Sequence, residues 1–397
     1  MSFTNSDITF FSYYCFAILK NTNFATGCKA ESNMWDKSKI IRVGVIGGGY
    51  MGKAHAVAAR VASANAELGV EIRLEGVAAS TPESAAQYKE KYGFRHAFES
   101  AESLLQSDQI DAVIIASPQS THLRFVELAA KTGKAILCEK PMGRDIAESQ
   151  SIVKLASHLP NLVGYNYIQT PATALAKKLL DEKTIGEIIW YRGEHHEDFL
   201  VNADCNEWRK VGDANGTLGD LMPHPIHNAL TLAGPITAVI ADMKQHSNVR
   251  KEKANPDAND DQVQCMCSFA NGANGFISAS RVAHGKKMGL TYEVHGTKGA
   301  LRFDQEDQNS LHLYRANQDA GFQRILAAPG HGQYAMFCQG PGHGTGYQDQ
   351  IIIEQVAFYQ AILGIKPASP SFKDGLEVMK VCTAIRQSYQ TQSWTLV

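Results

Sequence analysis

The stretch IRVGVIGGGYMG, residues 41–52, determines the architecture of the N-terminal part of the chain. Its apolar run predicts a buried strand, and Gly47, Gly49 and Gly52 then give the spacing G-x-G-x-x-G ahead of a helical pattern. We expect Gly47 to permit a tight turn, Gly49 to let a pyrophosphate approach the backbone, and Gly52 to let helix and strand pack closely. The N–H groups at the start of the helix favour the anion. The stretch therefore predicts a dinucleotide site, in preference to a glycine-rich turn without a ligand.

Strand and helix patterns alternate through residues 40–164, which is typical of a parallel sheet covered by helices on both faces. Strands are predicted at residues 41–46, 73–79, 111–116, 135–138 and 161–164. Helices are predicted at residues 54–68, 83–91, 100–106, 121–131 and 146–157. Residues 40–164 are thus expected to form a doubly wound α/β domain of the Rossmann type, which binds a nicotinamide dinucleotide.

The pattern changes after residue 164, where longer strand-like segments are separated by Asn, Gly and Asp turns. Residues 262–269 alternate most clearly, with Cys265 and Cys267 on the packed face. Further strands are predicted at residues 187–194, 238–244, 275–281, 290–295 and 300–303, loops at 246–260 and 316–346, and helices near 349–363 and 374–389. Residues 165–397 are therefore expected to form a second, α/β domain with a large, mainly antiparallel sheet.

The composition argues against several classes of protein. The chain has 397 residues, with 38 Lys and Arg against 40 Asp and Glu, so its net charge of -2 offers no basic surface for a nucleic acid or an anionic membrane. No apolar run is long enough to cross a bilayer. The eight cysteines include no C-x-x-C pair, which argues against a disulfide framework or a zinc ribbon and favours a reducing cytoplasm.

Residues 1–39 precede the first predicted strand and are interpreted separately. The apolar segment at residues 10–19 has the length of a signal-peptide core but lacks the preceding positive charge. The sequence ATGC at residues 25–28 loosely resembles a lipoprotein cleavage site. We favour the simpler interpretation that residues 1–39 are a disordered extension and that Met34 is the natural start.

The end of the second strand selects the adenosine half of a dinucleotide. The sequence AAST at residues 78–81 has no acidic residue there to accept a hydrogen bond from the ribose 2′-OH of NAD. Ser80 and Thr81 offer hydrogen bonds to a 2′-phosphate, although no Arg follows them directly. The cofactor is therefore predicted to be NADP or NAD, with a slight preference for NADP.

Two further segments follow parallel strands, at the edge where an open α/β sheet binds its ligand. They are ASPQSTH at residues 116–122 and CEKPMG at residues 138–143. Lys140 comes directly after a buried strand and before a proline, so we favour a site role over a solvated surface charge. The predicted cofactor-binding residues are Gly47, Gly49, Tyr50, Met51, Gly52, Ser80, Thr81, Ser117, Pro118, His122, Glu139 and Lys140.

Through GGGYMG, ASPQSTH, CEKPMG and the later GDLMPH at residues 219–224, the sequence resembles the Gfo/Idh/MocA family of glucose-fructose oxidoreductase and inositol dehydrogenase from residue 40 to residue 397. GYNY at residues 164–167 and YEVHG at residues 292–296 indicate closer similarity to its levoglucosan-dehydrogenase-like branch. The resemblance implies a second domain whose open-faced sheet carries substrate contacts and mediates assembly into a homo-oligomer, either a dimer or a tetramer.

The resemblance also implies a catalytic set of Lys140, Asp220 and His224. A histidine suits removal of a hydroxyl proton near neutral pH, and Lys140 is expected to stabilise negative charge on the substrate oxygen. Asp220 precedes His224 by four residues, so on one helix it would share a face with the imidazole and orient it; alternatively it caps a helix. The prolines on both sides of His224 make this geometry less secure.

The segment EHHEDF at residues 194–199, together with Trp208 and Arg209, is expected around the pocket, where it offers hydrogen bonds and an aromatic surface to a polyhydroxylated ring. The predicted substrate-binding residues are Asn166, Asp198, Trp208, Arg209 and His227. The family commonly has Asp where His227 stands. The branch tends to have Arg after the Asn-Tyr pair, where this chain has Ile168 and Gln169, and the loss of that donor disfavours a phosphorylated substrate. The nearby histidines lack a clean ligand spacing, so no metal site is predicted.

These expectations describe an oxidoreductase that moves a hydride between nicotinamide C4 and a secondary alcohol of a cyclic polyol, sugar or glycoside. Two alternatives stay open. One is a redox-neutral, NAD-dependent glycosidase or lyase that oxidises its substrate transiently, and the other is a non-catalytic nucleotide-binding protein. The joint presence of Lys140, Asp220 and His224 argues against the second alternative.

Overall fold

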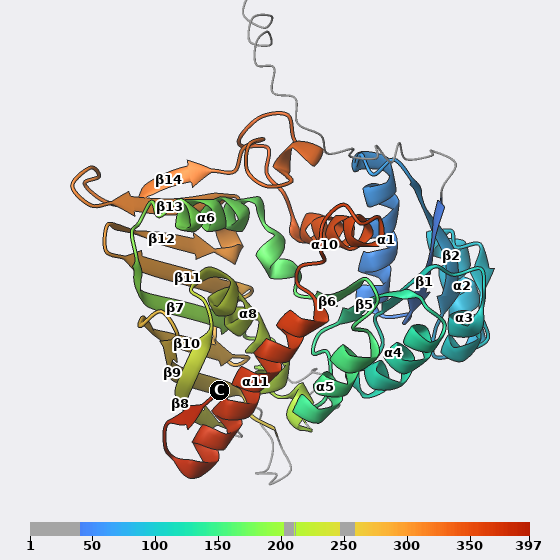
Figure 1. Ribbon diagram of the computed structural model, residues 1–397, viewed down its shortest axis with the longest axis horizontal. Helices are drawn as coiled ribbons and strands as arrows, with labels where there is room; N and C mark the ends of the chain where they lie inside the picture. The colour runs from blue at the N-terminus through green and yellow to red at the C-terminus, as the bar shows by residue number, and fades with distance from the viewer. Residues whose placement is uncertain (1–39, 202–209, 211, 247–258) are drawn as a thin grey trace, which may run out of the picture. The chain divides into compact units, whose positions relative to one another are not determined.

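A six-stranded parallel sheet forms the centre of the N-terminal part of the molecule (Figure 1). The computed structural model describes residues 40–201, 210, 212–246 and 259–397, so the expected extension at residues 1–39 lies outside the described residues. The strands lie in the order β3 (His96–Ala97), β2 (Glu71–Ala78), β1 (Ile40–Ile46), β4 (Ala112–Ile115), β5 (Ala135–Glu139) and β6 (Asn161–Gly164). This order is that of a Rossmann fold, as predicted.

Five helices connect these strands, and local sequence sets where several of them begin. They are α1 (Tyr50–Asn65), α2 (Pro82–Tyr92), α3 (Ala101–Gln106), α4 (His122–Lys131) and α5 (Ile146–Leu155). The side chains of Thr81, Ser100 and Asp145 accept hydrogen bonds from backbone N–H groups in the first turns of α2, α3 and α5. Helix α1 differs, because its N-cap residue is Gly49, which has no side chain to accept a hydrogen bond from the first turn of the helix.

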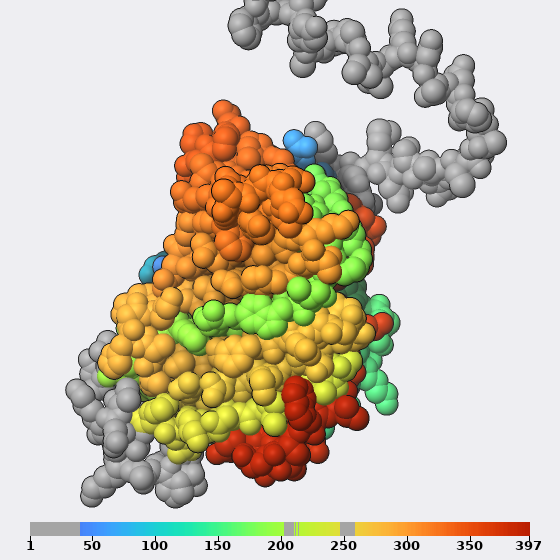
Figure 2. Space-filling model, turned by 90° about the vertical axis from the view of Figure 1, so that its left-hand side faces the viewer, coloured from blue at the N-terminus to red at the C-terminus, as the bar shows by residue number. Residues whose placement is uncertain are grey.

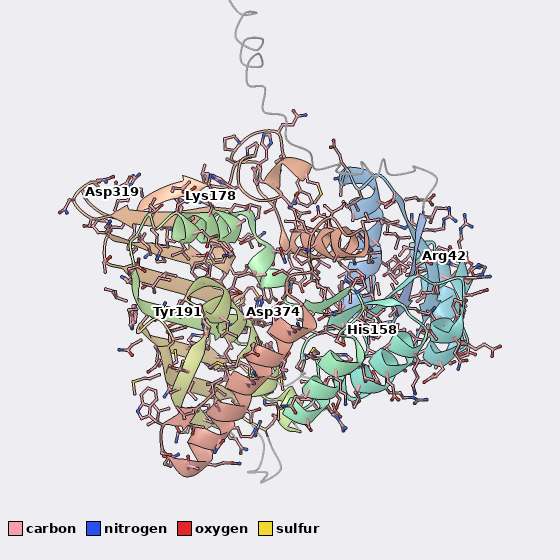
Figure 3. All side chains as sticks on the ribbon, in the orientation of Figure 1. Arg42, His158, Lys178, Tyr191, Asp319 and Asp374 are labelled. Atoms are coloured by element: carbon pink, nitrogen blue, oxygen red, sulfur yellow. The ribbon has the colours of Figure 1, made fainter. Side chains whose placement is uncertain are left out.

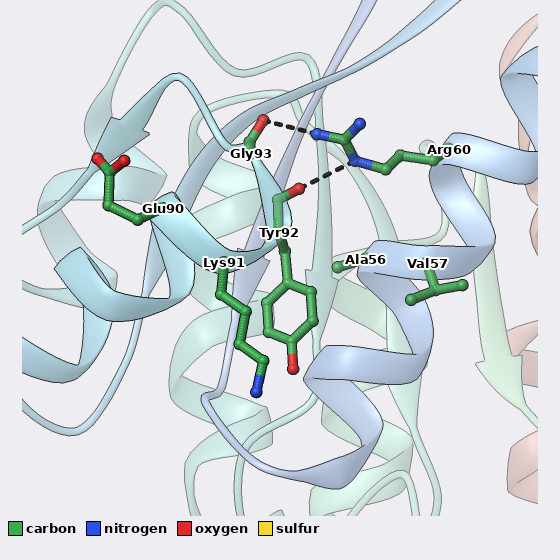
Figure 4. A pocket seen from close by; sticks show the side chains of 7 residues that line it. All are labelled: Ala56, Val57, Arg60, Glu90, Lys91, Tyr92 and Gly93. Carbon is green, nitrogen blue, oxygen red and sulfur yellow. Dashed lines mark hydrogen bonds between the residues drawn. The ribbon is translucent and has the colours of Figure 1, made fainter.

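Arg60 ties helix α1 to the end of helix α2 (Figure 4). Its Nε donates to Tyr92 O at 2.9 Å and its Nη2 donates to Gly93 O at 3.1 Å. Carbonyls at a helix C-terminus lack partners within the helix, and a positive charge suits the negative end of the helix dipole. The pocket that these residues line is therefore explained by the packing of two helices.

A nine-stranded sheet forms the centre of the C-terminal part. Its order is β14 (Gln323–Leu326), β13 (Ser310–Arg315), β12 (Gly299–Asp304), β11 (Gly289–Gly296), β7 (Ile188–His196), β10 (Asn274–Ser280), β9 (Gln262–Phe269), β8 (Ile236–Lys244) and β15 (Thr395–Leu396). Strands β7 and β10 pair in parallel, and the other neighbouring pairs are antiparallel. The predicted large, mainly antiparallel sheet is confirmed.

One face of this second sheet is exposed, and Figure 2 shows its strands as adjacent bands on the surface of the molecule. Strand β9 explains how the two faces differ. Cys265 and Cys267 are buried, as predicted, whereas the side chain between them, Met266, points outward and is 54% exposed. Alternation along the strand therefore gives the sheet one packed and one open face.

Helices α6 (Pro171–Asp181), α8 (Pro223–Leu232) and α11 (Phe372–Thr391) pack on strands of the second sheet. Tyr191 of β7 is buried in its core, and Figure 3 shows its place in the sheet. Helix α11 also packs on α5, and helix α10 (Tyr347–Ile362) packs on α1. Because these late helices contribute to the core of the first sheet, the boundary that we placed between residues 164 and 165 stays a prediction.

Most of the predicted elements are confirmed, and the differences are local. The stretch 316–346, which we expect to be a loop, contains strand β14, so this expectation is wrong. Strand β14 lies at the sheet edge beside β13, and most of its side chains are exposed, so it has no apolar alternation to detect. Helices α6 and α8 and strand β13 are also absent from the predicted elements.

Candidate active site

The glycine turn after β1 has the geometry of a dinucleotide site. Gly47 has a φ of 124°, and a Cβ on it would lie 2.3 Å from Ala116 O. A Cβ on Gly52 would lie 2.0 Å from Gly47 O, whereas a Cβ on Gly49 would meet no described atom within 4 Å. The turn is therefore tightly packed underneath and open on the side of Gly49, at the uncapped N-terminus of α1, which fits a pyrophosphate.

Aromatic side chains lie beside this turn. Tyr50 is 65% exposed and stacks on Tyr347 with ring centroids 6.3 Å apart. The sulfur of Met51 lies 3.7 Å from Tyr347 Oη, and Tyr88 Oη donates to Gly49 O at 2.9 Å. Two predicted cofactor residues, Tyr50 and Met51, thus contact the start of helix α10.

The loops after β4 and β5 are joined by His122. One of its ring nitrogens lies 2.9 Å from Ser117 O, and the other lies 3.1 Å from Pro141 O. The imidazole is buried, and burial lowers its pKa. The predicted cofactor residues Ser117 and Pro118 lie on the loop itself, whereas the ring of His122 is buried between the backbone of this loop and that of the loop after β5.

Lys140 follows β5 and reaches the end of the short helix α7 (Thr217–Asp220). Its Nζ donates to Asp220 Oδ1 at 2.8 Å and to Asp220 O at 2.9 Å. The side chains are 18% and 24% exposed, so water screens this ion pair only partly. The pair therefore links the carboxyl edge of the first sheet to the chain that leads into helix α8.

His224 is the second residue of helix α8, and its ring is buried. The rings of Tyr167 and His195 contact it edge-on, with centroid distances of 4.6 and 5.4 Å. Burial lowers the pKa of His224 well below its ordinary value, and the positive charge of Lys140 lowers this pKa further. The imidazole is therefore neutral near neutral pH and is able to accept a proton.

The expected pairing of Asp220 with His224 on one helix is wrong. Asp220 is the last residue of α7, and His224 belongs to α8. Pro223 and Pro225 occupy the first turn of α8, where the missing N–H groups cost no helical hydrogen bond. The Asp220 carboxylate binds Lys140, while Nδ1 of His224 has no hydrogen-bond partner among the described residues.

Tyr167 and His195 contact His224, and each contacts one further side chain, Tyr347 and Glu197 respectively. His195 and Glu197 belong to the segment 194–199 that we expect around the pocket, whereas Tyr167 and Tyr347 are not among the predicted site residues. The ring centroids of Tyr167 and Tyr347 lie 5.9 Å apart. His195 Nε2 lies 2.9 Å from Glu197 Oε1, and His195 Nδ1 lies 3.2 Å from Leu221 O. Tyr167 follows β6 at the same sheet edge as Lys140, which is a signal in the sequence. Tyr347 has no such signal, because it follows strand β14 and is far in sequence from the strands of the first sheet.

The residues at the adenosine end are compatible with either nicotinamide dinucleotide. Strand β2 ends at Ala78, and Ser80 is exposed. Thr81 Oγ1 accepts a hydrogen bond from Ser84 N at 3.2 Å as the cap of helix α2. Because the Thr81 hydroxyl already caps helix α2, the Ser80 hydroxyl is the one of the two that is left to contact a ligand.

The five predicted substrate residues differ in burial and in their partners, and two of them lie outside the described residues. Asn166 is buried and donates to Gln350 Oε1 at 3.3 Å, and His227 is buried with its ring stacked on Tyr165 at 4.6 Å. Asp198 accepts a hydrogen bond from Lys287 Nζ at 2.7 Å. Trp208 and Arg209 lie outside the described residues. The roles of all five in substrate binding stay predictions.

The histidines near the site point to different partners. His196 Nε2 lies 2.9 Å from Ser278 Oγ, while His227 stacks on Tyr165. Within the part of the chain that the structure describes, no group of three or more His, Cys, Asp or Glu side chains is arranged to hold a metal ion.

No helix in the described part of the chain has the length and apolar character needed to cross a membrane.

The fold thus combines a dinucleotide turn with a buried histidine beside a lysine–aspartate pair, as expected for the class of NAD(P)-dependent oxidoreductases. Comparisons with known proteins agree. Residues 41–167 match the family model described as an oxidoreductase family with an NAD-binding Rossmann fold, and residues 173–302 match the GFO/IDH/MocA C-terminal domain. The chain belongs to the Gfo/Idh/MocA family, and its cofactor is NAD or NADP.

Individual relatives cover nearly all of the described fold. Levoglucosan dehydrogenase of Pseudarthrobacter phenanthrenivorans is 34% identical over 382 residues, which are 89% of this chain and 97% of the relative. Inositol 2-dehydrogenase of Rhizobium meliloti is 29% identical over 356 residues, 88% of this chain and 96% of the relative. A solved structure of levoglucosan dehydrogenase with NADH and levoglucosan aligns with a TM-score of 0.85 at 34% identity, covering 90% of this chain and all of that one.

Proposed function

We propose that this protein is a dehydrogenase that transfers a hydride between NAD(P) and a secondary alcohol of a cyclic polyol, sugar or glycoside, with Lys140, Asp220 and His224 as its catalytic set. The observation that carries the proposal is the placement of the Lys140–Asp220 pair near a buried, neutral His224. Similarity to levoglucosan dehydrogenase and inositol 2-dehydrogenase along most of the chain supports the substrate class.

In the oxidising direction, bound NAD(P)⁺ supplies the hydride acceptor. His224 removes the proton of the substrate hydroxyl, since burial and the charge of Lys140 keep its imidazole neutral and so able to take up a proton. Lys140 donates a hydrogen bond to the substrate oxygen and stabilises the negative charge that develops there. Asp220 holds the ammonium in place. In the reducing direction, the protonated His224 returns the proton to the alkoxide oxygen.

Substrate contacts are proposed for side chains around this catalytic set. Tyr167 and Tyr347 offer aromatic faces to the apolar side of a sugar ring. Asn166, Asp198, Trp208, Arg209 and His227 remain the proposed hydrogen-bonding residues. Ser80 is the proposed contact to the adenosine ribose or its phosphate, and the glycine turn with Tyr50 and Met51 is the proposed contact to the rest of the dinucleotide.

The first experiment is a fluorescence titration of the purified protein with NADH and with NADPH. A panel of cyclic polyols, sugars and glycosides is then tested for formation of reduced nicotinamide. Binding together with reduction by one class of ring is the expected result. Binding with product formation but no net reduced nicotinamide would favour the redox-neutral enzyme, and binding without any turnover would favour a non-catalytic protein.

The protein is further proposed to act as a homo-oligomer, a dimer or a tetramer, in the cytoplasm. The open face of the second sheet supports assembly, because it exposes large apolar side chains such as Ile189 and Met266. The free cysteines Cys138, Cys265, Cys267, Cys338 and Cys382 suit a reducing compartment. Light scattering of the purified chain tests the assembly, and a monomer mass at micromolar concentration would contradict it. Met266→Glu is the matched variant that should weaken assembly.

A further inference from the structure

A buried chain of hydrogen bonds runs from helix α10 through helix α1 to the end of strand β5. Tyr359 Oη donates to Gln355 Oε1 at 2.7 Å, and Gln355 Nε2 lies 2.9 Å from His55 O and 3.0 Å from His55 Nδ1. On the other side of the ring, His55 Nε2 lies 2.9 Å from Glu139 Oε1. Tyr359, Gln355 and His55 have no exposed surface, and Glu139 is 7% exposed.

The direction of each hydrogen bond follows from the chemistry of the groups. The carbonyl of His55 only accepts, so the amide nitrogen of Gln355 faces it and also donates to Nδ1. Nδ1 is therefore the unprotonated nitrogen, and Nε2–H donates to Glu139 Oε1. Glu139 uses its other oxygen, Oε2, to accept the backbone N–H of Lys140 at 3.2 Å. One carboxylate thus accepts from both sides, which an amide at the same position cannot do.

We propose that His55, Gln355 and Glu139 are positioning residues that hold the backbone of Lys140, so that its ammonium is aimed at the substrate oxygen. The proposal rests on the role proposed above for Lys140. Asp220 fixes the far end of the lysine side chain, and Glu139 fixes the near end at the backbone. Both ends need to be fixed, because a displacement of about 1 Å in a catalytic group can lower a rate about a hundredfold.

The same hydrogen-bonded chain connects the elements that surround the reacting groups. Helix α1 begins at the dinucleotide turn and carries His55, and helix α10 begins at Tyr347 and carries Gln355. The hydrogen bonds therefore fix Lys140, helix α1 and the start of helix α10 at Tyr347 in position relative to one another. These hydrogen bonds require one tautomer of His55, with the proton on Nε2. Side chains that contributed only packing would not depend on that tautomer.

The tautomer dependence provides the test. In Glu139→Gln, the side chain presents an N–H group to one of two donors, so either the hydrogen bond from His55 or the one from the Lys140 backbone is lost. In the double variant Glu139→Gln/Gln355→Glu, the carboxylate introduced at position 355 accepts from Nδ1–H. His55 then adopts the other tautomer, and its Nε2 accepts from the amide introduced at position 139. The network keeps one amide and one carboxylate, and the direction of the hydrogen bonds through the His55 ring is reversed. The donor to His55 O is lost in the double variant, so the rescue is expected to be partial.

We expect Glu139→Gln to lower kcat by about ten- to a hundredfold with little change in the Kd for NADH, and the double variant to recover part of the lost kcat. Tyr359→Phe, which frees the amide of Gln355, is expected to lower kcat by a smaller factor. Tyr292→Phe is the matched control, because it removes a buried hydroxyl that donates to Thr173 Oγ1 at 3.3 Å outside the network. It is expected to leave kcat unchanged.

Three results would overturn the positioning role: an unchanged kcat in Glu139→Gln, a double variant that is folded but no faster than the single one, or equal effects of Tyr359→Phe and Tyr292→Phe. The last comparison stands even where Glu139→Gln does not fold. Lys140→Ala separates the two proposals. If Lys140→Ala keeps full activity, the proposed function fails; if it is inactive while Glu139→Gln is normal, only the positioning role fails.

Discussion

Lys140 and Asp220 are 80 residues apart in the sequence, yet Lys140 Nζ donates to Asp220 Oδ1 at 2.8 Å and to the Asp220 carbonyl at 2.9 Å. A lysine that makes both contacts is held by the carboxylate and by the C-terminal end of helix α7 at once. The ammonium is therefore directed rather than free to sample solvent. Close to this pair, His224 is kept neutral by burial and by the charge of the lysine. Lys140 thus binds the Asp220 carboxylate and also lowers the pKa of His224.

Replacement of His224 or Lys140, the two side chains proposed to act on the substrate oxygen, should reduce turnover strongly. His224→Ala and Lys140→Ala are each expected to lower kcat by at least about a hundredfold, because they remove a proton acceptor and a charge-stabilising donor. Steady-state reduction of NAD(P)⁺ with the best substrate measures the effect, and circular dichroism shows whether the fold is kept. His158→Ala, at an exposed position, is the control. Folded variants with unchanged rates would refute the assignment.

Two glycines of the same turn should respond in opposite ways to an added methyl group. Gly49→Ala is expected to fold normally, since no described atom lies within 4 Å of its Cβ, but to bind NADH about tenfold or more weakly because the methyl occupies the open side. Gly52→Ala places a Cβ 2.0 Å from Gly47 O and should lower stability by about 1–3 kcal/mol. Thermal melts and NADH titrations distinguish the two. Normal NADH binding by Gly49→Ala would place the cofactor elsewhere.

Cofactor preference should depend on Ser80. Ser80→Asp adds a negative charge just beyond strand β2, where it accepts from a ribose 2′-OH and repels a 2′-phosphate. We expect the ratio of the NADPH and NADH dissociation constants to rise by about tenfold, which corresponds to about 1.4 kcal/mol. Ser80→Asn is the uncharged control. Equal losses of both nucleotides in Ser80→Asp would show that this side chain lies away from the 2′ position.

The first sheet was predictable because its signals are local. Each buried strand is a continuous apolar run, and the turn at residues 47–52 needs glycine for steric reasons that the spacing alone reveals. Strand β14 gave no such signal, because an exposed edge strand has no face to bury. Periodicity detects burial, and elements with little buried surface therefore escape it.

The candidate site was predictable only in part, because its geometry depends on contacts distant in sequence. Lys140 and Tyr167 follow parallel strands and so fall at one edge, whereas Tyr347 reaches the site from helix α10. The pairing of Asp220 with His224 was wrong because spacing assumes one continuous helix, and the prolines begin a new helix between them. The network through Gln355 is equally non-local, since it joins residues 300 positions apart.

Acid should destabilise the fold partly through His227. Burial lowers the pKa of His227 from 6.5 to about 4, so between these values the unfolded chain binds a proton that the folded chain does not. Stability is expected to fall by about 3 kcal/mol as the pH drops through this window. His227→Phe, which keeps a ring against Tyr165, should flatten this part of the curve. Urea unfolding across the window measures it, and an unaltered slope in His227→Phe would contradict the assignment.

Glu354 should have the opposite dependence on pH. Its side chain has no exposed surface, and neither carboxyl oxygen has a hydrogen-bond partner among the described residues. Burial, and then the charge of Glu139, raise the pKa of Glu354 well above its ordinary value. Below the ordinary pKa, folded and unfolded chains are both protonated and nothing is lost. As the pH rises, the unfolded carboxyl ionises while the folded one stays neutral, so stability falls until the pH reaches the folded pKa.

Glu354→Gln keeps the shape of the neutral acid and removes its titration. We therefore expect the variant to match the parent protein at about pH 4 and to be more stable at about pH 8, by about 1.4 kcal/mol for each pH unit above the ordinary pKa over which the folded carboxyl stays neutral. Urea unfolding at both pH values provides the measurement. Glu90→Gln, at a side chain that is 79% exposed, is the control and should show no such gain. A Glu354→Gln variant that is less stable than the parent protein at the higher pH would contradict the prediction. It would mean that the parent carboxylate is ionised in the folded protein and that a partner stabilises its charge, which the neutral amide cannot replace.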